Sequence, residues 1–349
     1  MRFHIHNRFS LRENRFFASE LDELGVDYEL IPEGIEMSYR SRWEQLSKWV
    51  QLLRVSRVKL KRSLAADPLP DVVTFNTPFE ALVFARLSAR EERRPTAVLT
   101  TFIVAQAGSA FTNWARRTYY RIVLRSVRIA VCHTREELAT YQAMFPEMAE
   151  RLIYLPYGYV RDDHGEARQE PYALPESPFL FSGGRSGRDY GTLLAAVHDL
   201  DIPVYIACDS HQFLPDEAHS SNVHVLRDCA IEAFKDMTAA ARVVVVPLAP
   251  ASHSAGQMVV LGAFAAGVPV ITSETPAILD YVDDGRAARL VPPADVDRLR
   301  SAIVELWSDE QARGQLGRAG QAYFDATLTR RAFWRGLVQH CVRVRGGHS

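Results

Sequence analysis

The segment from Val243 to Asp284 constrains the fold of this chain more than any other. It opens with four consecutive valines, which predict a short strand buried on both faces. Small polar residues follow from Ser252 to Gln257, then an alanine-rich run that ends at Gly267, then a second apolar run. This order of strand, loop, helix and strand brings backbone N–H groups and a helix N-terminus to one point, where an anion can bind. A βαβ unit with a purely structural role would show the same pattern.

The length of 349 residues favours two domains, because single hydrophobic cores rarely grow so large. No apolar run reaches the roughly 18 residues of a membrane span. The N-terminal stretch also lacks the apolar core of a secretory signal, so we expect a cytoplasmic protein. The cysteines are scattered without metal-ligand spacing, so we expect reduced thiols and no metal site. They are Cys132, Cys208, Cys229 and Cys341.

Strand-like and helix-like segments alternate along both halves of the chain, which predicts an α/β fold with two parallel sheets. A polar, proline-containing stretch without periodicity separates the halves and is typical of a linker. We therefore predict a first domain over residues 1–160, a linker over 161–178 and a second domain over 179–328. A last helix, over residues 329–349, is expected to pack back on the first domain. Two such domains would face each other across a cleft at the carboxyl ends of their strands.

The second domain begins with an apolar strand that runs into Gly183 and Gly184, followed closely by Arg185 and Arg188. The glycines permit a tight turn close to a ligand. Two guanidinium groups on such a turn suit a diphosphate, because arginine offers planar donors that stay charged. A solvated surface loop is the alternative. The turn lacks the G-x-G-x-x-G pattern and the acidic residue that follows it, which disfavours a dinucleotide dehydrogenase.

The second half resembles the nucleotide-sugar domain of GT-B glycosyltransferases, in particular the large retaining family of glycosyl transferases group 1. The resemblance is carried by Gly262–Val270, Asp280–Gly285 and Leu290–Asp295, with weaker matches at Ile129–Thr134 and Leu155–Gly158. It implies a GT-B fold of two Rossmann-like domains. It also implies a metal-independent hexosyltransferase without a cofactor, whose co-substrate is a nucleoside-diphosphate sugar.

The resemblance also implies where the donor binds. The diphosphate would be held by Arg185, Arg188, Ser254, Ala255, Gly256 and Gln257. The nucleotide pocket would be formed by Gly183, Gly184, Asp209, Leu226, Arg227, Asp228 and Gly262. The two glutamates typical of the family correspond to Ser254 and Gly262, which cannot act as charged acceptors, so no catalytic residue is identified. The amide of Gln257 is expected either to reach a sugar or phosphate oxygen or to face solvent.

The acceptor side of the first domain gives weaker signals. The candidates there are Glu13, Asn14, Thr101, Gln106 and His133. Alternatives remain, because Glu13 is also typical of an ordinary first-turn acid and His133 of a structural histidine. Asp295 and Asp297 imitate a metal-binding pair, but they follow a Pro-Pro turn, so we predict an N-cap instead.

Basic residues gather in two parts of the first domain. The segment from Arg40 to Arg62 holds eight basic side chains against one acid. A second cluster consists of Arg116, Arg117, Arg121, Arg125 and Arg128, interleaved with Trp114, Tyr119 and Tyr120. Basic amphipathic helices of this kind can lie on an anionic membrane surface. The alternative is that their apolar stripe packs on the sheet and their basic side chains are merely solvated. Nucleic acid is not an expected partner, because no binding module is present.

The sequence therefore predicts transfer of a sugar from a nucleoside diphosphate to a hydroxyl, with retention as the family resemblance implies. The acceptor would be a glycan, a lipid-linked glycan or a metabolite. A non-catalytic GT-B subunit that activates a partner transferase would explain the missing carboxylates equally well. A sugar-nucleotide epimerase is a further alternative, although such enzymes usually need several acids and histidines near the sugar.

Overall fold

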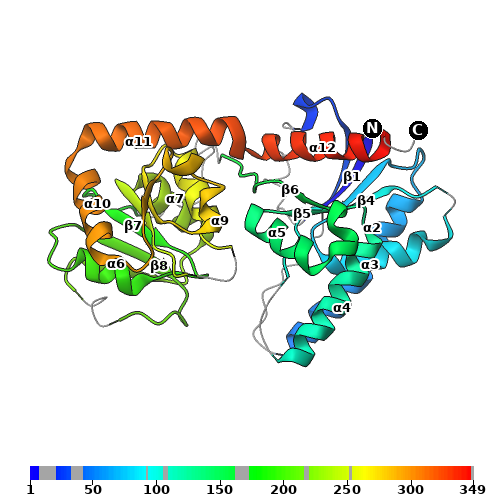
Figure 1. Cartoon of the computed structure of the whole chain (residues 1–349), viewed down its shortest axis with the longest axis horizontal. Coiled ribbons are helices and arrows are strands. Elements are labelled where there is room, and N and C mark those ends of the chain that lie inside the picture. Colours follow the sequence, from blue (N-terminus) through cyan, green and yellow to red (C-terminus); the bar gives the residue numbers. More distant parts are fainter. Residues whose placement is uncertain are drawn as a thin grey trace. The chain divides into compact units, whose positions relative to one another are not determined.

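The computed structural model divides the chain into two compact units (Figure 1). Unit 1 consists of Met1–Leu155 and Phe333–Ser349, and unit 2 consists of Pro156–Ala332. The structure describes residues 1–7, 21–32, 42–91, 93–104, 109–161, 173–215, 220–250 and 254–346, except the side chains of residues 7, 32 and 42–49.

Unit 1 is built on a six-stranded sheet in which all strand pairs are parallel. The strands run in the order β2-β1-β3-β4-β5-β6. They are β1 (Arg2–Asn7), β2 (Asp27–Pro32), β3 (Val72–Phe75), β4 (Thr96–Leu99), β5 (Ile129–Cys132) and β6 (Leu152–Tyr154). The helices between them are α2 (Arg42–Leu64), α3 (Pro78–Leu87), η1 (Ser88–Arg90), α4 (Ala110–Ser126), α5 (Arg135–Met144) and η2 (Pro146–Arg151).

Unit 2 also carries a six-stranded parallel sheet, in the order β12-β11-β10-β7-β8-β9. Its strands are β7 (Leu180–Gly183), β8 (Val204–Cys208), β9 (Val223–Arg227), β10 (Val243–Val246), β11 (Val270–Ser273) and β12 (Arg289–Val291). Its helices are α6 (Tyr190–Val197), α7 (Ile231–Ala240), α8 (Gln257–Ala265), α9 (Pro276–Leu279), η4 (Asp283–Gly285), α10 (Val296–Ser308), α11 (Glu310–Tyr323) and η5 (Phe324–Leu328). The strand order reverses between β7 and β10, which makes this pair the switch point of the sheet.

Both sheets are covered by apolar layers on two faces. In β10, Val244 and Val246 pack into the cluster that contains Phe264 of α8, while Val243 and Val245 pack into the opposite cluster. The predicted burial of this strand on both faces is therefore confirmed. In unit 1 the face that carries Phe3 and Ile5 is covered by Trp334, Leu337 and Cys341 of α12 (Arg330–Gly346). The predicted α/β class with two parallel sheets is likewise confirmed.

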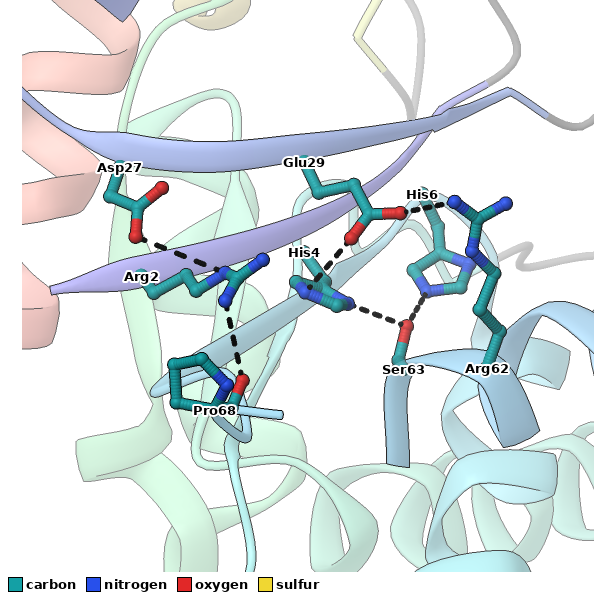
Figure 2. A network of polar contacts seen from close by, with 8 residues as sticks. All are labelled: Arg2, His4, His6, Asp27, Glu29, Arg62, Ser63 and Pro68. Carbon is teal, nitrogen blue, oxygen red and sulfur yellow. Dashed lines mark hydrogen bonds and ion pairs between the residues drawn. The ribbon is translucent and has the colours of Figure 1, made fainter. Parts of the chain in front are cut away.

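The opposite face of β1 carries a buried polar network (Figure 2). His4 and His6 alternate with Phe3 and Ile5, and both imidazoles reach the hydroxyl of Ser63 on α2, at 3.1 Å from His4 Nδ1 and 3.0 Å from His6 Nε2. Glu29 of β2 completes the network. Its carboxylate lies 3.4 Å from His4 Nε2 and accepts a hydrogen bond from Arg62.

The direction of each hydrogen bond in this network follows from the residue types. Burial lowers the pKa of His4 and lowers that of His6 to about 3, so both imidazoles are neutral near pH 7. A carboxylate attracts an N–H group and repels a nitrogen lone pair, so the His4 proton lies on Nε2, which faces Glu29 at 3.4 Å without forming a hydrogen bond, and His4 Nδ1 accepts from the Ser63 hydroxyl. Ser63 Oγ then accepts from His6 Nε2. The network fastens β1, β2 and α2 together through two neutral imidazoles, a hydroxyl and the Glu29–Arg62 ion pair.

Candidate functional site

The switch point of unit 2 brings together the two segments that the sequence singled out. The loops after β7 and β10 are hydrogen-bonded to each other, because the N–H of Asp189 donates to Pro247 O and the N–H of Ala249 donates to Gly187 O, each at 3.0 Å. In open parallel sheets, ligands bind beyond the carboxyl ends of the strands at such a point. Topology alone therefore makes this edge the candidate site.

The side chain of Arg188 turns onto the backbone of the loop after β7 and shapes this loop, instead of pointing toward a ligand. Its guanidinium donates from Nε to Gly183 O and from Nη1 to Ser186 O, each at 2.8 Å. A Cβ added to Gly184 would collide with that guanidinium, and Gly184 has a φ of +114°, which favours glycine. Arg188 therefore holds the turn in shape and uses two of its donors inside the protein.

Arg185 has a different environment from Arg188. Its side chain is 79 % exposed, and its Nε lies 3.3 Å from Asp209 Oδ2. An exposed ion pair of this kind contributes at most about 1 kcal/mol, so the guanidinium exchanges readily to a phosphate. Arg185 also lines a pocket of about 410 Å³ together with Asp209 and Asp228.

The loop after β8 is braced from β9. Arg227 Nη1 donates to the carbonyls of Asp209 and Gln212, at 3.0 and 2.8 Å. Asp228 accepts from the N–H of Ser210 at 2.9 Å, and this bond lowers the pKa of Asp228. Of the predicted nucleotide-pocket residues, Asp209 and Asp228 thus line the pocket. Arg227 braces the loop beside it, and Leu226 packs against the core.

The N-terminus of α8 presents backbone and side-chain donors at the same edge. Gly256 caps the helix with a φ of +92°, and Ala255 before it is buried. Gln257 is only 5 % exposed, so the solvent-facing alternative for its amide is wrong. Its Nε2 is buried without a hydrogen-bond partner in the described part of the chain. A buried, unpaired amide donor is costly unless a ligand satisfies it. Ser254 lies half-buried just before this helix.

Gly262 lies farther along α8 and lines a second pocket of about 240 Å³. The two pockets share Phe234, Met258 and Val259. A Cβ added to Gly262 would lie 3.4 Å from the phenol oxygen of Tyr159, so the tyrosine ring fills part of the space that a longer side chain would need. Tyr159 and Gly262 thus line the same pocket side by side.

In unit 1 the structure pairs two of the acceptor-side candidates. Thr101 Oγ1 lies 3.1 Å from His133 Nε2, and His133 Nδ1 lies 3.0 Å from Leu155 O. A carbonyl only accepts, so Nδ1 donates and Nε2 accepts from the Thr101 hydroxyl. Burial lowers the pKa of His133 to about 4, so the ring is neutral near pH 7. Glu13, Asn14 and Gln106 lie outside the described residues.

The acidic pair at the start of α10 has the predicted capping role. Asp295 Oδ1 accepts from the N–H of Arg298 at 2.9 Å, as an N-cap does. Across the described ranges, no group of three or more histidine, cysteine or acidic residues is arranged to hold a metal ion.

Sequence reasoning missed the apolar lining of the pocket that contains Arg185. This lining includes Ile231 and Phe234 of α7 and Met258 of α8. Ile231 and Met258 are strongly exposed for apolar side chains, at 65 % and 53 %. Exposed apolar residues at a polar edge suit a flat ring, such as a nucleobase. Their sequence context, an amphipathic helix for Ile231 and an almost entirely apolar helix for Met258, gave no signal of this role.

Comparison with known proteins agrees with the fold described above. Residues 191–309 match the family model of glycosyl transferases group 1. Among solved structures, sucrose-phosphate synthase from Thermosynechococcus elongatus is similar, with a TM-score of 0.68, 17 % identity, and coverage of 99 % of this chain and 100 % of that chain. A glycosyltransferase from Rickettsia africae has a TM-score of 0.64 at 13 % identity, covering 98 % of each chain.

The HepE protein of Anabaena, solved in complex with UDP and glucose, has a TM-score of 0.61 at 14 % identity, covering 97 % of this chain and 99 % of that chain. No curated protein matches the chain. At these identities the solved structures establish the fold alone. The chain therefore has the GT-B fold of glycosyltransferases, and over residues 191–309 it carries a domain of the glycosyl transferases group 1 family.

Proposed function

We propose that this protein transfers a sugar from a nucleoside-diphosphate sugar to a hydroxyl acceptor, with retention of configuration and without a cofactor or metal ion. The observation that carries the proposal is the buried amide Nε2 of Gln257, which lacks a partner in the described structure at the N-terminus of α8. This helix also contributes Met258 and Val259 to the pocket that Arg185 lines. Backbone N–H groups, an amide and a guanidinium at one edge suit a diphosphate.

Each group has a defined task in this proposal. Arg185 and the N–H groups at the start of α8 stabilise the negative charge that develops on the leaving nucleoside diphosphate. Asp209 and Asp228 supply oxygen acceptors for the nucleoside, and Ile231 and Met258 offer apolar contact to its base. Arg188 acts indirectly, since it keeps the turn at Gly184 close to the phosphates. The acceptor is a glycan, a lipid-linked glycan or a small metabolite.

A specific observation favours a second candidate, a GT-B subunit that binds the donor but activates a partner transferase. Ser254 and Gly262 provide no carboxylate, and the ring of Tyr159 lies beside Gly262. Loss of both charged groups would leave the contacts to the base and the diphosphate in place while it removed contacts to the sugar and the ribose.

We further propose that unit 1 rests on an anionic membrane surface on the cytoplasmic side. Figure 1 shows α4 projecting from the sheet of unit 1. Phe111 and Trp114 on this helix are 72 % and 63 % exposed and stack on each other at 6.0 Å. Exposed aromatics beside arginines are typical of helices that lie in a membrane interface. In the described part of the chain, no helix has the length and apolarity needed to cross a bilayer.

The donor proposal is tested by titrating the full chain with UDP, GDP and ADP by calorimetry. We expect one of them to bind, and Arg185→Ala to weaken it at least about tenfold, since a charged hydrogen bond contributes about 1.5–3 kcal/mol. Arg286→Ala is the matched control, because Arg286 is 75 % exposed and ion-paired with Asp283 but does not line the pocket. Absence of binding by every nucleotide, or equal affinity in the Arg185 variant, contradicts the proposal.

Incubation with a panel of nucleotide sugars then separates the candidates. Release of nucleotide together with a glycosylated acceptor supports a transferase. Binding without turnover supports the subunit, and formation of an epimeric nucleotide sugar supports an epimerase.

A further inference from the structure

Unit 1 contains a second, strongly basic cavity at the amino ends of β4 and β5. Its volume is about 550 Å³, within the range of about 300–1,000 Å³ that small-molecule sites occupy. Six arginines line it: Arg93, Arg94, Arg125, Arg128, Arg151 and Arg345. No acidic side chain lines it among the residues that the structure describes.

Two of these arginines are fixed in place by the fold. Arg151 Nη1 donates to the carbonyls of Leu124 and Val127, at 2.8 and 3.1 Å, where α4 ends and β5 begins. Arg345 near the end of α12 donates to Asp71 O at 2.8 Å and forms an ion pair with its carboxylate at 2.7 Å. These bonds hold the walls of the cavity and the segment between α4 and β5.

Arg125 and Arg128 lie on that fixed segment, but their side chains do not bond to the fold as those of Arg151 and Arg345 do. Both side chains are exposed, and neither has a hydrogen bond or an ion pair to another described side chain. Glu147, whose charge also reaches Arg125, is already ion-paired with Arg121 at 2.7 Å. The cavity therefore presents two guanidinium groups whose donors are available to a ligand.

Negative groups around the cavity offset part of the positive charge of the arginines, but not all of it. The C-terminal turns of α3, α4 and α12 all contribute to the lining, and a helix C-terminus carries about half a negative charge. Asp71 adds one full charge, which Arg345 and Arg93 share. Against these groups stand six guanidinium ions, so roughly three to four positive charges stay uncompensated by the residues that the structure describes. So many like charges around one cavity create a positive potential that attracts anions to it.

We propose that this cavity binds a ligand that carries two or more phosphate groups. Arginine forks match phosphate oxygens in pairs, and clustered phosphates are the common biological anions with enough charge to offset the surplus. The ligand is not the sugar donor, because donors in this fold bind at carboxyl strand ends and this cavity lies at amino ends. It is either a soluble polyphosphorylated molecule or a phosphorylated lipid head group.

Calorimetric titration of the full chain with inorganic tripolyphosphate tests the first source. The titration uses an Arg185→Ala background, so that the donor site of unit 2 contributes less to the measured binding. We expect Arg125→Ala combined with Arg128→Ala to weaken binding at least about a hundredfold, since each lost guanidinium–phosphate bond costs about tenfold. The matched control combines Arg54→Ala with Arg57→Ala, two exposed arginines of α2 outside the cavity.

Cosedimentation with phosphatidylcholine vesicles, with and without phosphatidylinositol bisphosphate, tests the second source. If the protein binds the phosphorylated vesicles, and only the Arg125→Ala/Arg128→Ala double variant binds them more weakly, the ligand is a lipid head group. If the protein binds tripolyphosphate, and only this double variant binds it more weakly, the ligand is a soluble molecule. The proposal is overturned if neither probe binds, or if the two double variants behave alike with both probes. Circular dichroism of each variant verifies that the fold is retained.

Discussion

The two sheets have the same architecture but bury different chemistry. Unit 1 buries ionisable side chains on and beside its strands, among them His4, His6 and His133. The described strands of unit 2 bury hydroxyl groups instead, at Ser182, Thr272 and Ser273, around the all-valine β10. Neutral hydroxyls keep the same charge at any pH, whereas a buried imidazole is stable only while it stays unprotonated.

The two units therefore differ in where their titratable and polar groups lie relative to the sheet. The sheet of unit 2 is an apolar scaffold, and its chemistry is confined to the loops at the switch point. The sheet of unit 1 carries titratable groups inside the scaffold itself. The two units should therefore respond differently to acid, to the loss of a buried hydroxyl and to a lipid surface.

The largest expected effect is selective acid destabilisation of unit 1. The pKa values of His6 and His133 are lowered to about 3 and about 4 when folded, against about 6.5 when unfolded. Below pH 6.5 the unfolded chain therefore binds protons that the folded chain does not. The free energy of unfolding therefore decreases as the pH is lowered, by on the order of 3 kcal/mol for each histidine between pH 7 and pH 4.

Hydrogen exchange measured on peptides from each unit checks this prediction. Peptides from β1 and β5 should lose protection on acidification before peptides from β7 and β10 do. His6→Gln, which cannot take up a proton, should flatten the response of unit 1. His211→Gln, at an exposed histidine of unit 2, should leave it unchanged. Simultaneous loss of protection in both units would break the comparison.

A smaller effect is expected when the buried hydroxyl of the network is removed. Ser63→Ala leaves His4 Nδ1 and His6 Nε2 without their shared partner, which should lower the free energy of unfolding by about 1–3 kcal/mol. Ser56 offers a matched control on the same helix, because it is equally buried but its hydroxyl has no hydrogen-bond partner in the described structure. Urea denaturation should show Ser56→Ala to be neutral or stabilising. Equal losses in the two variants would mean that packing, not the network, matters at Ser63.

The smallest effect concerns the surfaces of the two units. Trp114→Ser should weaken cosedimentation with anionic vesicles about tenfold, as expected when one large apolar side chain no longer enters the interface. Phe213→Ser is the control from unit 2, since Phe213 is also a strongly exposed aromatic residue, at 82 %. Equal weakening by the two changes would remove the distinction between the units in membrane binding.

The sequence predicted features whose cause is local. The valine run, the glycine turn after β7 and the N-cap at Asp295 each depend on residues within a few positions of one another, and the structure confirms them. The inward fold of Arg188 was not predicted although its partners are also local, because the residue types do not say whether a guanidinium binds its own loop or a ligand. The network around Ser63 also escaped, since Ser63 lies 59 and 57 positions from His4 and His6.

The basic cavity of unit 1 shows the same limit on a larger scale. Sequence reasoning found Arg125 and Arg128 as part of a helical charge cluster. It gave no reason to place Arg151 and Arg345 beside them, because they come from η2 and from the C-terminal helix. Only the parallel order of the strands brings these segments to one end of the sheet.

The hydrogen bonds between the loops after β7 and β10 have a consequence for protein engineering. Arg188 and Leu248 pair as an antiparallel bridge, flanked by the bonds from Asp189 and Ala249. Neither loop keeps its conformation independently of the other. A change of donor preference by loop exchange would therefore need both segments, residues 183–189 and 247–257, to be transplanted as one cassette.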